Sequence, residues 1–398
     1  MAVSGDRLER IGDYPFDRLR ALLNPVTPRV NEPIMLSIGE PQHTPPPIIK
    51  ETVSEHAALW GRYPPMAGTP EFRRAVADWL ARRYALPDGL VDPDKNVIPV
   101  SGTREALFMI ALAAVPERGE GAAPPAVLMP NPFYQVYLGA AVVAGGEPVL
   151  VPATREVGFL PDFVALDAAT LARTALAYYC SPANPQGAIA ALDTLRALVR
   201  LARRHGFVMA FDECYSEIYA ADPPPGGLAA CAAEGGGLEG VLVFNSLSKR
   251  SSAPGLRSGF VAGDERLIRR FTRLREYGGA APPLPLLAAA TALWRDEAHV
   301  AENRALYRKK FDLAEAALGG KHGFYRPDGG FYLWLEVGDG EAAAQRLWRE
   351  AGIRVMPGAY LARADASGRN PGAGYIRCAL VHDLETTDRA LQRMRAVL

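Results

Sequence analysis

One lysine of the chain has the surroundings that amine chemistry requires. Lys249 ends the run Asn245-Ser246-Leu247-Ser248-Lys249, in which a serine-rich loop follows an apolar segment predicted to be a strand. Ligands of open α/β sheets gather at the carboxyl ends of strands, so a lysine held there can be desolvated and act as a nucleophile. A loop lysine without suitable neighbours is most often a solvated charge. The residues around Lys249 therefore decide whether it is a functional amine.

Two further strand ends supply complementary groups. Asp212 and Tyr215 follow the apolar segment 207–211, and Asn184 follows the segment 176–180. A carboxylate placed there can pair with the protonated nitrogen of a cofactor ring, and a phenol or an amide can hydrogen-bond the ring oxygen or a substrate carboxylate. Ordinary explanations stay open, because an aspartate can cap a turn and Asn-Pro is itself a turn signal.

The segment after residue 100 indicates a phosphate site. Gly102, Thr103 and Arg104 stand where an apolar strand ends and a helix begins, and the N–H groups of a helix start bind phosphate. Arg257 could add a charge-assisted hydrogen bond to the same group. Tyr134, after the next strand, could stack on a flat ring. Plain helix capping and an aromatic packed on a helix explain the same residues equally simply.

An arginine also interrupts an apolar strand. Arg377 lies within the run Tyr375-Ile376-Arg377-Cys378-Ala379-Leu380. A buried guanidinium is costly unless an anion pairs with it. The α-carboxylate of a substrate would be such an anion, and an internal salt bridge is the alternative.

Short apolar runs alternating with helical patterns predict the scaffold that positions these residues. The runs are near-continuous, which is typical of a parallel sheet with both faces covered. We therefore predict an α/β fold with a mostly parallel central sheet, helices on both faces, and a smaller second α/β domain. The expected strands of the sheet are 97–100, 126–129, 149–151, 176–180, 207–211, 241–244 and 259–262.

The pattern along the chain predicts three parts. Residues 1–45 form an N-terminal arm that joins the small domain, residues 46–285 form the large domain, and residues 286–398 form a connecting helix and the small domain. The second part contains a clear helix start, with Thr69 as N-cap and Pro70 at the first helical position. The third part begins with a long helical stretch over about 286–317, followed by strands near 330–337, 353–355 and 375–380.

Composition excludes several classes of partner. The 398 residues are 49% hydrophobic and 22% charged, with 44 basic and 44 acidic side chains, so no net field favours nucleic acid or anionic membrane. The four cysteines and six histidines show no spacing of metal ligands. The N-terminus lacks a signal pattern and no apolar run is long enough to span a membrane. We expect a cytoplasmic protein that binds neither metal, membrane nor nucleic acid.

Two other motif matches fail on their context. Ser246-Leu247-Ser248-Lys249 fits the S-x-x-K nucleophile of penicillin-binding proteins, but the K-T-G and S-D-N partners do not occur. The glycines of 235–240 fit G-x-G-x-x-G, but that loop precedes a strand instead of following one. A flexible connection explains it better.

In their order and separation, these residues resemble those of the class I and II aminotransferases of the pyridoxal phosphate (PLP) fold type I superfamily. The likeness extends over nearly the whole chain. It is carried by Ile38-Gly39-Glu40-Pro41, the stretch 63–73, Gly102, Asn184-Pro185, Asp212 with Tyr215, Ser246-x-Ser248-Lys249, Arg257 and Arg377.

The resemblance implies a role for each matching residue. Lys249 would hold PLP covalently and move the substrate proton, Asp212 would keep the ring nitrogen protonated, and Tyr215 and Asn184 would contact the ring oxygen. Arg377, with Asn184 and the Gly39 backbone, would bind the substrate α-carboxylate. The remaining contacts with the cofactor would come from Gly102, Thr103, Arg104 (backbone), Tyr134, Ser246, Ser248 and Arg257. Tyr63 would reach the phosphate of a neighbouring subunit, which implies a homodimer with shared sites.

The implied reaction transfers an amino group from an amino acid to a 2-oxo acid, with glutamate and 2-oxoglutarate as the expected pair. The strings 14–19, 131–137 and 213–219 look most like N-succinyl-diaminopimelate aminotransferases of lysine biosynthesis. Broad aspartate or alanine aminotransferases and a β-lyase on the same fold stay open as alternatives, as do a decarboxylase and a racemase. A regulator that borrowed the fold would need a basic DNA-binding segment before Tyr14, which this sequence does not show.

Overall fold

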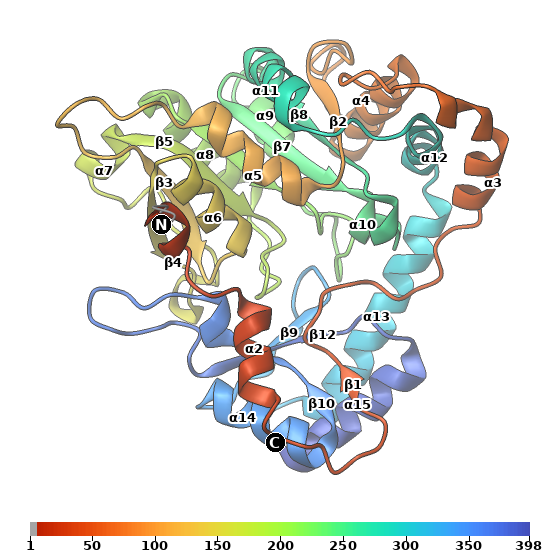
Figure 1. The fold of residues 1–398 in the computed structure, drawn as a ribbon, viewed down its shortest axis with the longest axis vertical. Coiled ribbons are helices and arrows are strands. Elements are labelled where there is room, and N and C mark those ends of the chain that lie inside the picture. Colours follow the sequence, from red (N-terminus) through yellow and green to blue (C-terminus); the bar gives the residue numbers. More distant parts are fainter. Residues whose placement is uncertain (1–5) are drawn as a thin grey trace, which may run out of the picture.

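The computed structural model describes residues 6–398, and its centre is a seven-stranded sheet (Figure 1). The strand order is β2-β8-β7-β6-β5-β3-β4, and β8 is the strand that runs against both of its neighbours. The other pairs are parallel, which confirms the predicted mostly parallel sheet. In sequence order the strands are β2 (Val97–Val100), β3 (Ala126–Asn131), β4 (Glu147–Pro152), β5 (Thr174–Cys180), β6 (Val208–Asp212), β7 (Val241–Ser246) and β8 (Gly259–Gly263).

This topology places the important strand ends together. β2 and β7 are both antiparallel to β8 and therefore point the same way as β6, β5 and β3. Cys180, Asp212 and Phe244 are paired across three neighbouring strands, so the loops that follow them leave the sheet at one edge. Those loops and helix starts contain most of the residues predicted to do chemistry.

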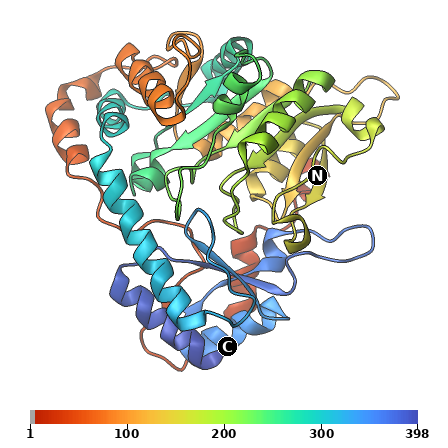
Figure 2. The same cartoon turned by 180° about the vertical axis from the view of Figure 1, so that it is seen from behind.

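Helices cover both faces of the sheet, as Figures 1 and 2 show from opposite sides. The alternation of the strands divides the core, since Tyr178 belongs to one buried cluster and Tyr179 to the other. One face is covered by α5 (Thr103–Ala114), α6 (Gln135–Val143) and α11 (Glu265–Gly278), and the other by α4 (Pro70–Tyr84), α8 (Leu192–His205), α9 (Gly227–Ala233) and α12 (Leu284–Arg295).

Helix α4 begins as its sequence predicts. The Thr69 hydroxyl accepts a hydrogen bond from the Phe72 amide at 3.2 Å, and Pro70 occupies the first turn. Its apolar stripe, which includes Val76 and Trp79, is buried against the sheet and against Trp294 of α12. A capped amphipathic helix with one fully buried face is the outcome that the spacing favours.

A second, smaller layer is built from the C-terminal part and the N-terminal arm. Its antiparallel sheet has the order β11-β12-β9, made of β9 (Tyr332–Glu336), β11 (Met356–Pro357) and β12 (Tyr375–Ala379). The arm strand β1 (Ile34–Met35) pairs with β10 (Ile353–Arg354). Its helices are α13 (Ala298–Leu318), α14 (Gly340–Arg346) and α15 (Leu384–Val397). We propose the division at residues 45 and 285 on the support of this pairing, and of Ile34 and Leu36 packing in the C-terminal cluster.

The long helical stretch predicted over 286–317 is two helices. Helix α12 ends at Arg295 and α13 begins at Ala298. Asp296 explains the break, because its carboxylate accepts hydrogen bonds from the amides of Ala298 and His299 and so begins a new helix. The other helices are short: α1 (Asp6–Glu9), α2 (Pro15–Leu23), α3 (Ile48–Glu55), α7 (Ala168–Ala172) and α10 (Leu247–Arg250). Single 3₁₀ or π turns occupy Ala57–Gly61, Arg155–Val157, Pro254–Leu256, Leu347–Ala351 and Gly358–Leu361.

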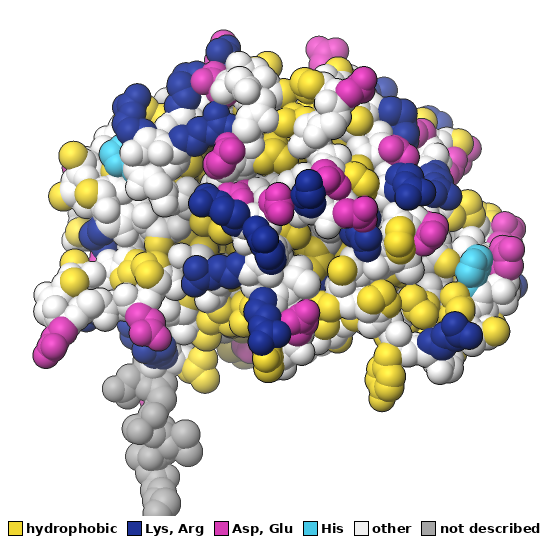
Figure 3. Space-filling view, turned by 90° about the horizontal axis from the view of Figure 1, so that it is seen from above, with side chains coloured by type: hydrophobic (Ala, Val, Ile, Leu, Met, Phe, Trp, Pro, Cys, Tyr) yellow, Lys and Arg dark blue, Asp and Glu magenta, His cyan; other side chains and the backbone are white. Residues whose placement is uncertain are grey.

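The surface has no dominant sign of charge on the face seen from above, where basic and acidic side chains are interspersed (Figure 3). None of the helices described between residues 6 and 398 is long and apolar enough to cross a membrane. The same residues contain no cluster of three or more His, Cys, Asp or Glu side chains that could hold a metal ion.

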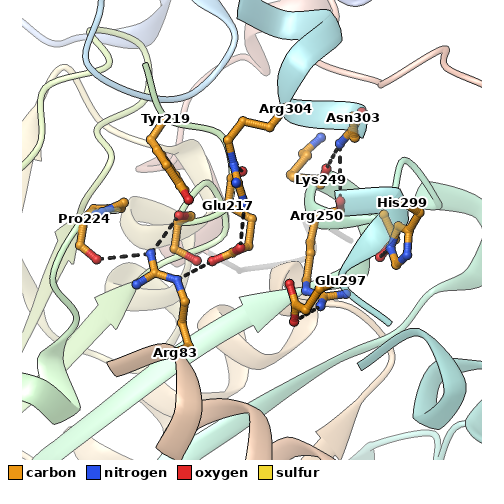
Figure 4. A network of polar contacts seen from close by, with 12 residues as sticks. Arg83, Glu217, Tyr219, Pro224, Lys249, Arg250, Glu297, His299, Asn303 and Arg304 are labelled. Atoms are coloured by element: carbon orange, nitrogen blue, oxygen red, sulfur yellow. Dashed lines mark hydrogen bonds and ion pairs between the residues drawn. The ribbon is translucent and has the colours of Figure 1, made fainter. Parts of the chain in front are cut away.

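A buried ion cluster ties α4 to α13 (Figure 4). The Glu217 carboxylate, 4% exposed, is 2.6 Å from Arg83 Nε and 3.2 Å from Arg304 Nη2. Both guanidinium groups also donate to carbonyl oxygens, of Pro224 and of Glu217 itself. Because the cluster is desolvated and its hydrogen bonds are satisfied, removing the carboxylate would leave two arginines without their anion.

We predict that Glu217→Ala lowers the free energy of unfolding by about 3–5 kcal/mol, the usual cost of breaking a buried pair. Chemical denaturation followed by circular dichroism measures this change. The control is Glu265→Ala, which removes an exposed pair with Arg269, and its effect should stay below about 0.5 kcal/mol. Equal effects of the two substitutions would contradict the prediction.

Candidate active site

A cavity of about 550 Å³ lies between the carboxyl edge of the large sheet and the small domain. Twelve of the fourteen site residues predicted from the sequence line it. They are Gly39, Thr103, Arg104, Tyr134, Asn184, Asp212, Tyr215, Ser246, Ser248, Lys249, Arg257 and Arg377. Gly102 lies directly beside the cavity, next to Thr103, and Tyr63 lies away from it.

Lys249 is presented by the short helix α10, which follows β7 directly. Ser246 caps this helix, because its hydroxyl accepts a hydrogen bond from the Ser248 amide at 3.1 Å. The Lys249 amine donates to the Gly39 carbonyl oxygen and lies 5.3 Å from the centre of the Phe331 ring. Burial lowers the pKa of Lys249 to about 8, so the neutral amine is far more accessible near neutral pH than in an ordinary lysine.

Asp212 ends the neighbouring strand β6 and points into the same cavity. Its carboxylate accepts hydrogen bonds from the Tyr137 hydroxyl at 2.6 Å and from the Cys214 amide at 3.3 Å. Burial raises the pKa of Asp212, while these hydrogen bonds and the Lys249 charge oppose the rise. Within residues 6–398 this carboxylate forms no ion pair, so a cation bound beside it would relieve the cost of its burial.

Tyr137 is a contact of Asp212 that the sequence reasoning missed. It lies on α6, three residues after the predicted Tyr134, and its ring stacks on Tyr178 at 4.5 Å between centroids. A tyrosine in the apolar helix Gln135–Val143 has the pattern of a core residue. The one available signal is its closeness to Tyr134, the residue just before α6, whose ring lies edge-on to that of Tyr137 at 5.6 Å between centroids.

Two tyrosines and one asparagine form the next wall. The hydroxyls of Tyr215 and Tyr332 are 3.2 Å apart, and both residues are buried. The carbonyl oxygen of the Asn184 side chain accepts a hydrogen bond from Arg377 Nη1 at 3.2 Å. Tyr332 was also missed, because it comes from β9 in the small domain and no motif marks it.

The start of α5 forms a positively polarised corner of the cavity. Gly102 has a φ of +90°, and a Cβ there would lie 2.2 Å from the Arg257 guanidinium, so glycine lets the arginine approach. Arg257 donates to the carbonyl oxygens of Pro254 at 2.8 Å and Ser101 at 3.2 Å. Free N–H groups at a helix start, a guanidinium and the Ser246 and Ser248 hydroxyls together suit a phosphate.

Side chains around this corner are themselves connected. Arg104 Nε donates to the Tyr134 hydroxyl at 3.0 Å, so its side chain borders the cavity in addition to its predicted backbone role. The Thr103 hydroxyl lies 3.0 Å from the Cys214 sulfur. Burial raises the pKa of Tyr134 to about 12, which keeps this phenol a neutral hydrogen-bonding group.

Arg377 has no carboxylate partner among the described residues. Its Nη2 donates to the Ser37 carbonyl oxygen at 2.9 Å, and its guanidinium carbon lies 4.4 Å above the Tyr332 ring. Its Nε is buried and forms no hydrogen bond, and the residue is 5% exposed. The internal salt bridge considered as an alternative is therefore wrong, and the cavity presents an unpaired guanidinium suited to an external carboxylate.

Tyr63 is fully exposed and does not meet the other predicted residues within one chain. Its predicted contact with a neighbouring subunit concerns a second chain, so it stays a prediction.

The residues of the cavity fit pyridoxal phosphate. An amine of lowered pKa can bind its aldehyde, an unpaired buried carboxylate can face its ring nitrogen, and the corner at α5 can hold its phosphate. The three features match three different groups of the cofactor. The unpaired guanidinium of Arg377 can bind the carboxylate of a second molecule, the substrate.

Comparisons with known proteins agree with this chemistry. The sequence pattern described as "Aminotransferase class I and II" matches residues 31–394. The chain is 31% identical, over its whole length and 98% of the relative, to an LL-diaminopimelate aminotransferase of Desulforudis audaxviator. It is 32% identical to a 4-dedimethylamino-4-oxo-anhydrotetracycline transaminase of Streptomyces rimosus, over 97% of this chain and all of the relative.

Solved structures give the same result. An aminotransferase of Neisseria meningitidis is 41% identical, covers 98% of both chains and superposes with a TM-score of 0.92. Aminotransferase AspB of Helicobacter pylori is 36% identical over 96% of this chain and 98% of its own, with a TM-score of 0.88. The chain therefore belongs to the class I and II aminotransferases and is a transaminase that depends on pyridoxal phosphate.

Proposed function

We propose that the enzyme transfers the amino group of N-succinyl-LL-diaminopimelate to 2-oxoglutarate in lysine biosynthesis. The observation that carries an amino-acid substrate is the buried guanidinium of Arg377, which has no carboxylate of its own chain and faces the cavity of Lys249. The diaminopimelate skeleton is supported by relatives named LL-diaminopimelate aminotransferase at 31% and 32% identity. The succinyl group rests on the likeness of the strings 14–19, 131–137 and 213–219.

Each side chain has a role in this proposal. Pyridoxal phosphate supplies an electron sink that makes the Cα–H bond of the bound amino acid acidic. Lys249 would hold the cofactor and, once its amine is free, would take the proton from the substrate Cα and deliver it to the cofactor. Asp212, oriented by Tyr137, keeps a positive charge on the ring nitrogen. Tyr215 and Asn184 donate hydrogen bonds to the ring oxygen, and Tyr134 stacks on the ring.

The phosphate contacts follow from the corner at α5. The backbone N–H groups of Thr103 and Arg104, the hydroxyls of Ser246 and Ser248, and the Arg257 guanidinium can all point at one anion beside Gly102. We assign these residues to cofactor binding. They would hold the phosphate, a group of the cofactor that takes no part in the bond changes.

Arg377 favours transfer over decarboxylation, one of the alternatives on the same fold. A carboxylate fixed by a guanidinium is stabilised in place, which opposes its loss as carbon dioxide. Asn184 orients Arg377 and the Gly39 backbone closes the same side of the cavity. Broad aspartate or alanine specificity and β-elimination remain the alternatives that the substrate test below distinguishes.

We also propose a homodimer with shared sites in a reducing, cytoplasmic setting. Trp60, in the 3₁₀ turn Ala57–Gly61, and Tyr63, just after that turn, expose large aromatic surfaces, which suits contact with a second chain. In the proposed dimer Tyr63 reaches the partner's phosphate. All four cysteines are free, as expected where disulfides do not form.

We predict that Lys249→Ala lowers kcat by about 10³-fold or more, because a positioned base contributes about 10²–10⁴-fold. The purified wild-type enzyme should be yellow, and the variant should bind the cofactor without a covalent bond while its circular dichroism spectrum is unchanged. Lys95→Ala, at an exposed lysine outside the cavity, is the control and should keep full activity. Normal turnover by the Lys249 variant would overturn the proposal.

We predict that Arg377→Ala raises KM for the amino donor by about 10²-fold, since each hydrogen bond to a charged group is worth about 1.5–3 kcal/mol. Arg377→Lys should recover part of this loss, as a lysine keeps the charge without the bidentate geometry. Steady-state kinetics measure both. An unchanged KM would show that this guanidinium serves the fold instead of the substrate.

The substrate is tested with a panel of amino donors and 2-oxoglutarate. We expect the highest kcat/KM for N-succinyl-LL-diaminopimelate, ahead of LL-diaminopimelate, acetylornithine, aspartate and alanine. Preference for unacylated LL-diaminopimelate would contradict the assignment of the succinyl group but support that of the diaminopimelate skeleton. Preference for aspartate or alanine, or release of pyruvate and ammonia from a β-substituted donor, would overturn the assignment to lysine biosynthesis.

A further inference from the structure

Three polar residues outside the active-site cavity, two of them buried and one half-buried, form a continuous chain of hydrogen bonds. Lys310 of α13 has no exposed surface, and its Nζ is 2.5 Å from His43 Nε2 and 3.0 Å from the Leu380 carbonyl oxygen. His43 Nδ1 is 2.5 Å from the Asn303 side-chain oxygen. Asn303 in turn contacts the backbone of the helix that carries Lys249.

The direction of this chain follows from Asn303. Its amide nitrogen is 3.2 Å from the carbonyl oxygens of both Lys249 and Arg250, which can only accept (Figure 4). Its amide oxygen therefore faces the Ser252 hydroxyl, at 2.9 Å, and His43. Because that oxygen can only accept, His43 Nδ1 bears the hydrogen and Nε2 is left to accept from Lys310.

Charge and burial agree with this direction. Burial, followed by the neighbouring Lys310, lowers the pKa of His43 and favours the neutral ring that can accept at Nε2. Lys310 forms no ion pair with a carboxylate in the part of the chain that the structure describes, and burial lowers its pKa to about 7. A buried lysine without an anion is costly, so its hydrogen bonds to His43 and Leu380 are the contacts that hold it there.

The chain meets the active site at three points. It supplies donors to two carbonyls at the end of the four-residue helix α10, which lack partners within so short a helix. It holds the arm, whose Gly39 carbonyl accepts from the Lys249 amine and whose Gln42 amide donates to Val381. It also contacts Leu380, which directly follows the strand that carries Arg377.

We propose that His43, Asn303 and Lys310 are positioning residues that fix the Lys249 amine relative to the carboxylate site at Arg377. The inference rests on the proposed function, since it takes Lys249 as the base and Arg377 as the carboxylate site. None of the three touches the cavity, so they act through the backbone of α10 and through the arm.

The test substitutes His43 in two ways. His43→Phe keeps a ring against Tyr307, whose centroid is 4.7 Å from that of His43, but removes both hydrogen bonds. His43→Asn keeps a donor near the position of Nδ1. Lys310→Met removes the first donor with little change of volume, and His56→Phe, outside the chain of hydrogen bonds, is the matched control.

We expect His43→Phe to lower kcat by about 10²-fold, as a small misplacement of a catalytic group does, with less than about a threefold change in KM. Hydrogen exchange of the cofactor-free protein should become about tenfold faster in residues 36–44 and 247–252 and stay unchanged in β5 and β6. Lys310→Met should act in the same direction, His43→Asn should recover most of kcat, and His56→Phe should match the wild type.

Two results would overturn the inference. One is unchanged kcat and unchanged exchange in 247–252 for both His43→Phe and Lys310→Met. The other is faster exchange throughout the sheet with unchanged kcat, which would show a purely structural role. Failure of the proposed function is a separate result, because Lys249→Ala would then retain turnover whatever the His43 variants do.

Discussion

The desolvation of one amine beside one carboxylate is the constraint on which the site depends. Lys249 and Asp212 follow neighbouring strands, β7 and β6, whose parallel pairing sends both chains out of the sheet at the same edge. Burial disfavours the charged form of each group, so it lowers the pKa of the lysine and raises that of the aspartate. The lowered pKa makes the lysine amine a better nucleophile. The buried aspartate, in turn, is stabilised by a cationic partner.

The large sheet alone does not complete this site. Arg377 and Tyr332 come from the small antiparallel sheet, and Gly39 comes from the arm that pairs with it through β1 and β10. The cofactor-facing groups thus belong to one layer and the carboxylate-facing groups to the other. A substrate that binds Arg377 while it reacts above Lys249 must contact both layers, which ties its binding to their relative position.

The sequence predicted the parts of the fold that local physics determines. Apolar runs ended within a few residues of the observed strands, and Thr69 with Pro70 marked the start of α4 because capping needs those residue types there. Most of the twelve site residues that line the cavity could be predicted because strand ends gather in α/β sheets. Arg377 was predicted from the cost of burying its charge, and Gly39 from the resemblance alone. Tyr137 was missed because a tyrosine in an apolar helix resembles a core residue. The contact of His43 with Lys310 spans 267 positions, and no local pattern signals it.

Around the active site, the protein keeps buried polar groups that lower its stability but fix the arrangement of the charged side chains. Arg377 has an unpartnered Nε, Asp212 has no cation, and Lys310 has no anion among the described residues, and all three lie within the arm, the small domain or the sheet edge that surround one cavity. A core selected only for stability would replace such groups by apolar ones of similar volume. Asp212 and Arg377 line the cavity of Lys249, and Lys310 is connected to Lys249 through His43 and Asn303. These costly groups therefore maintain a fixed arrangement of charge, which is a major means by which an enzyme lowers a barrier.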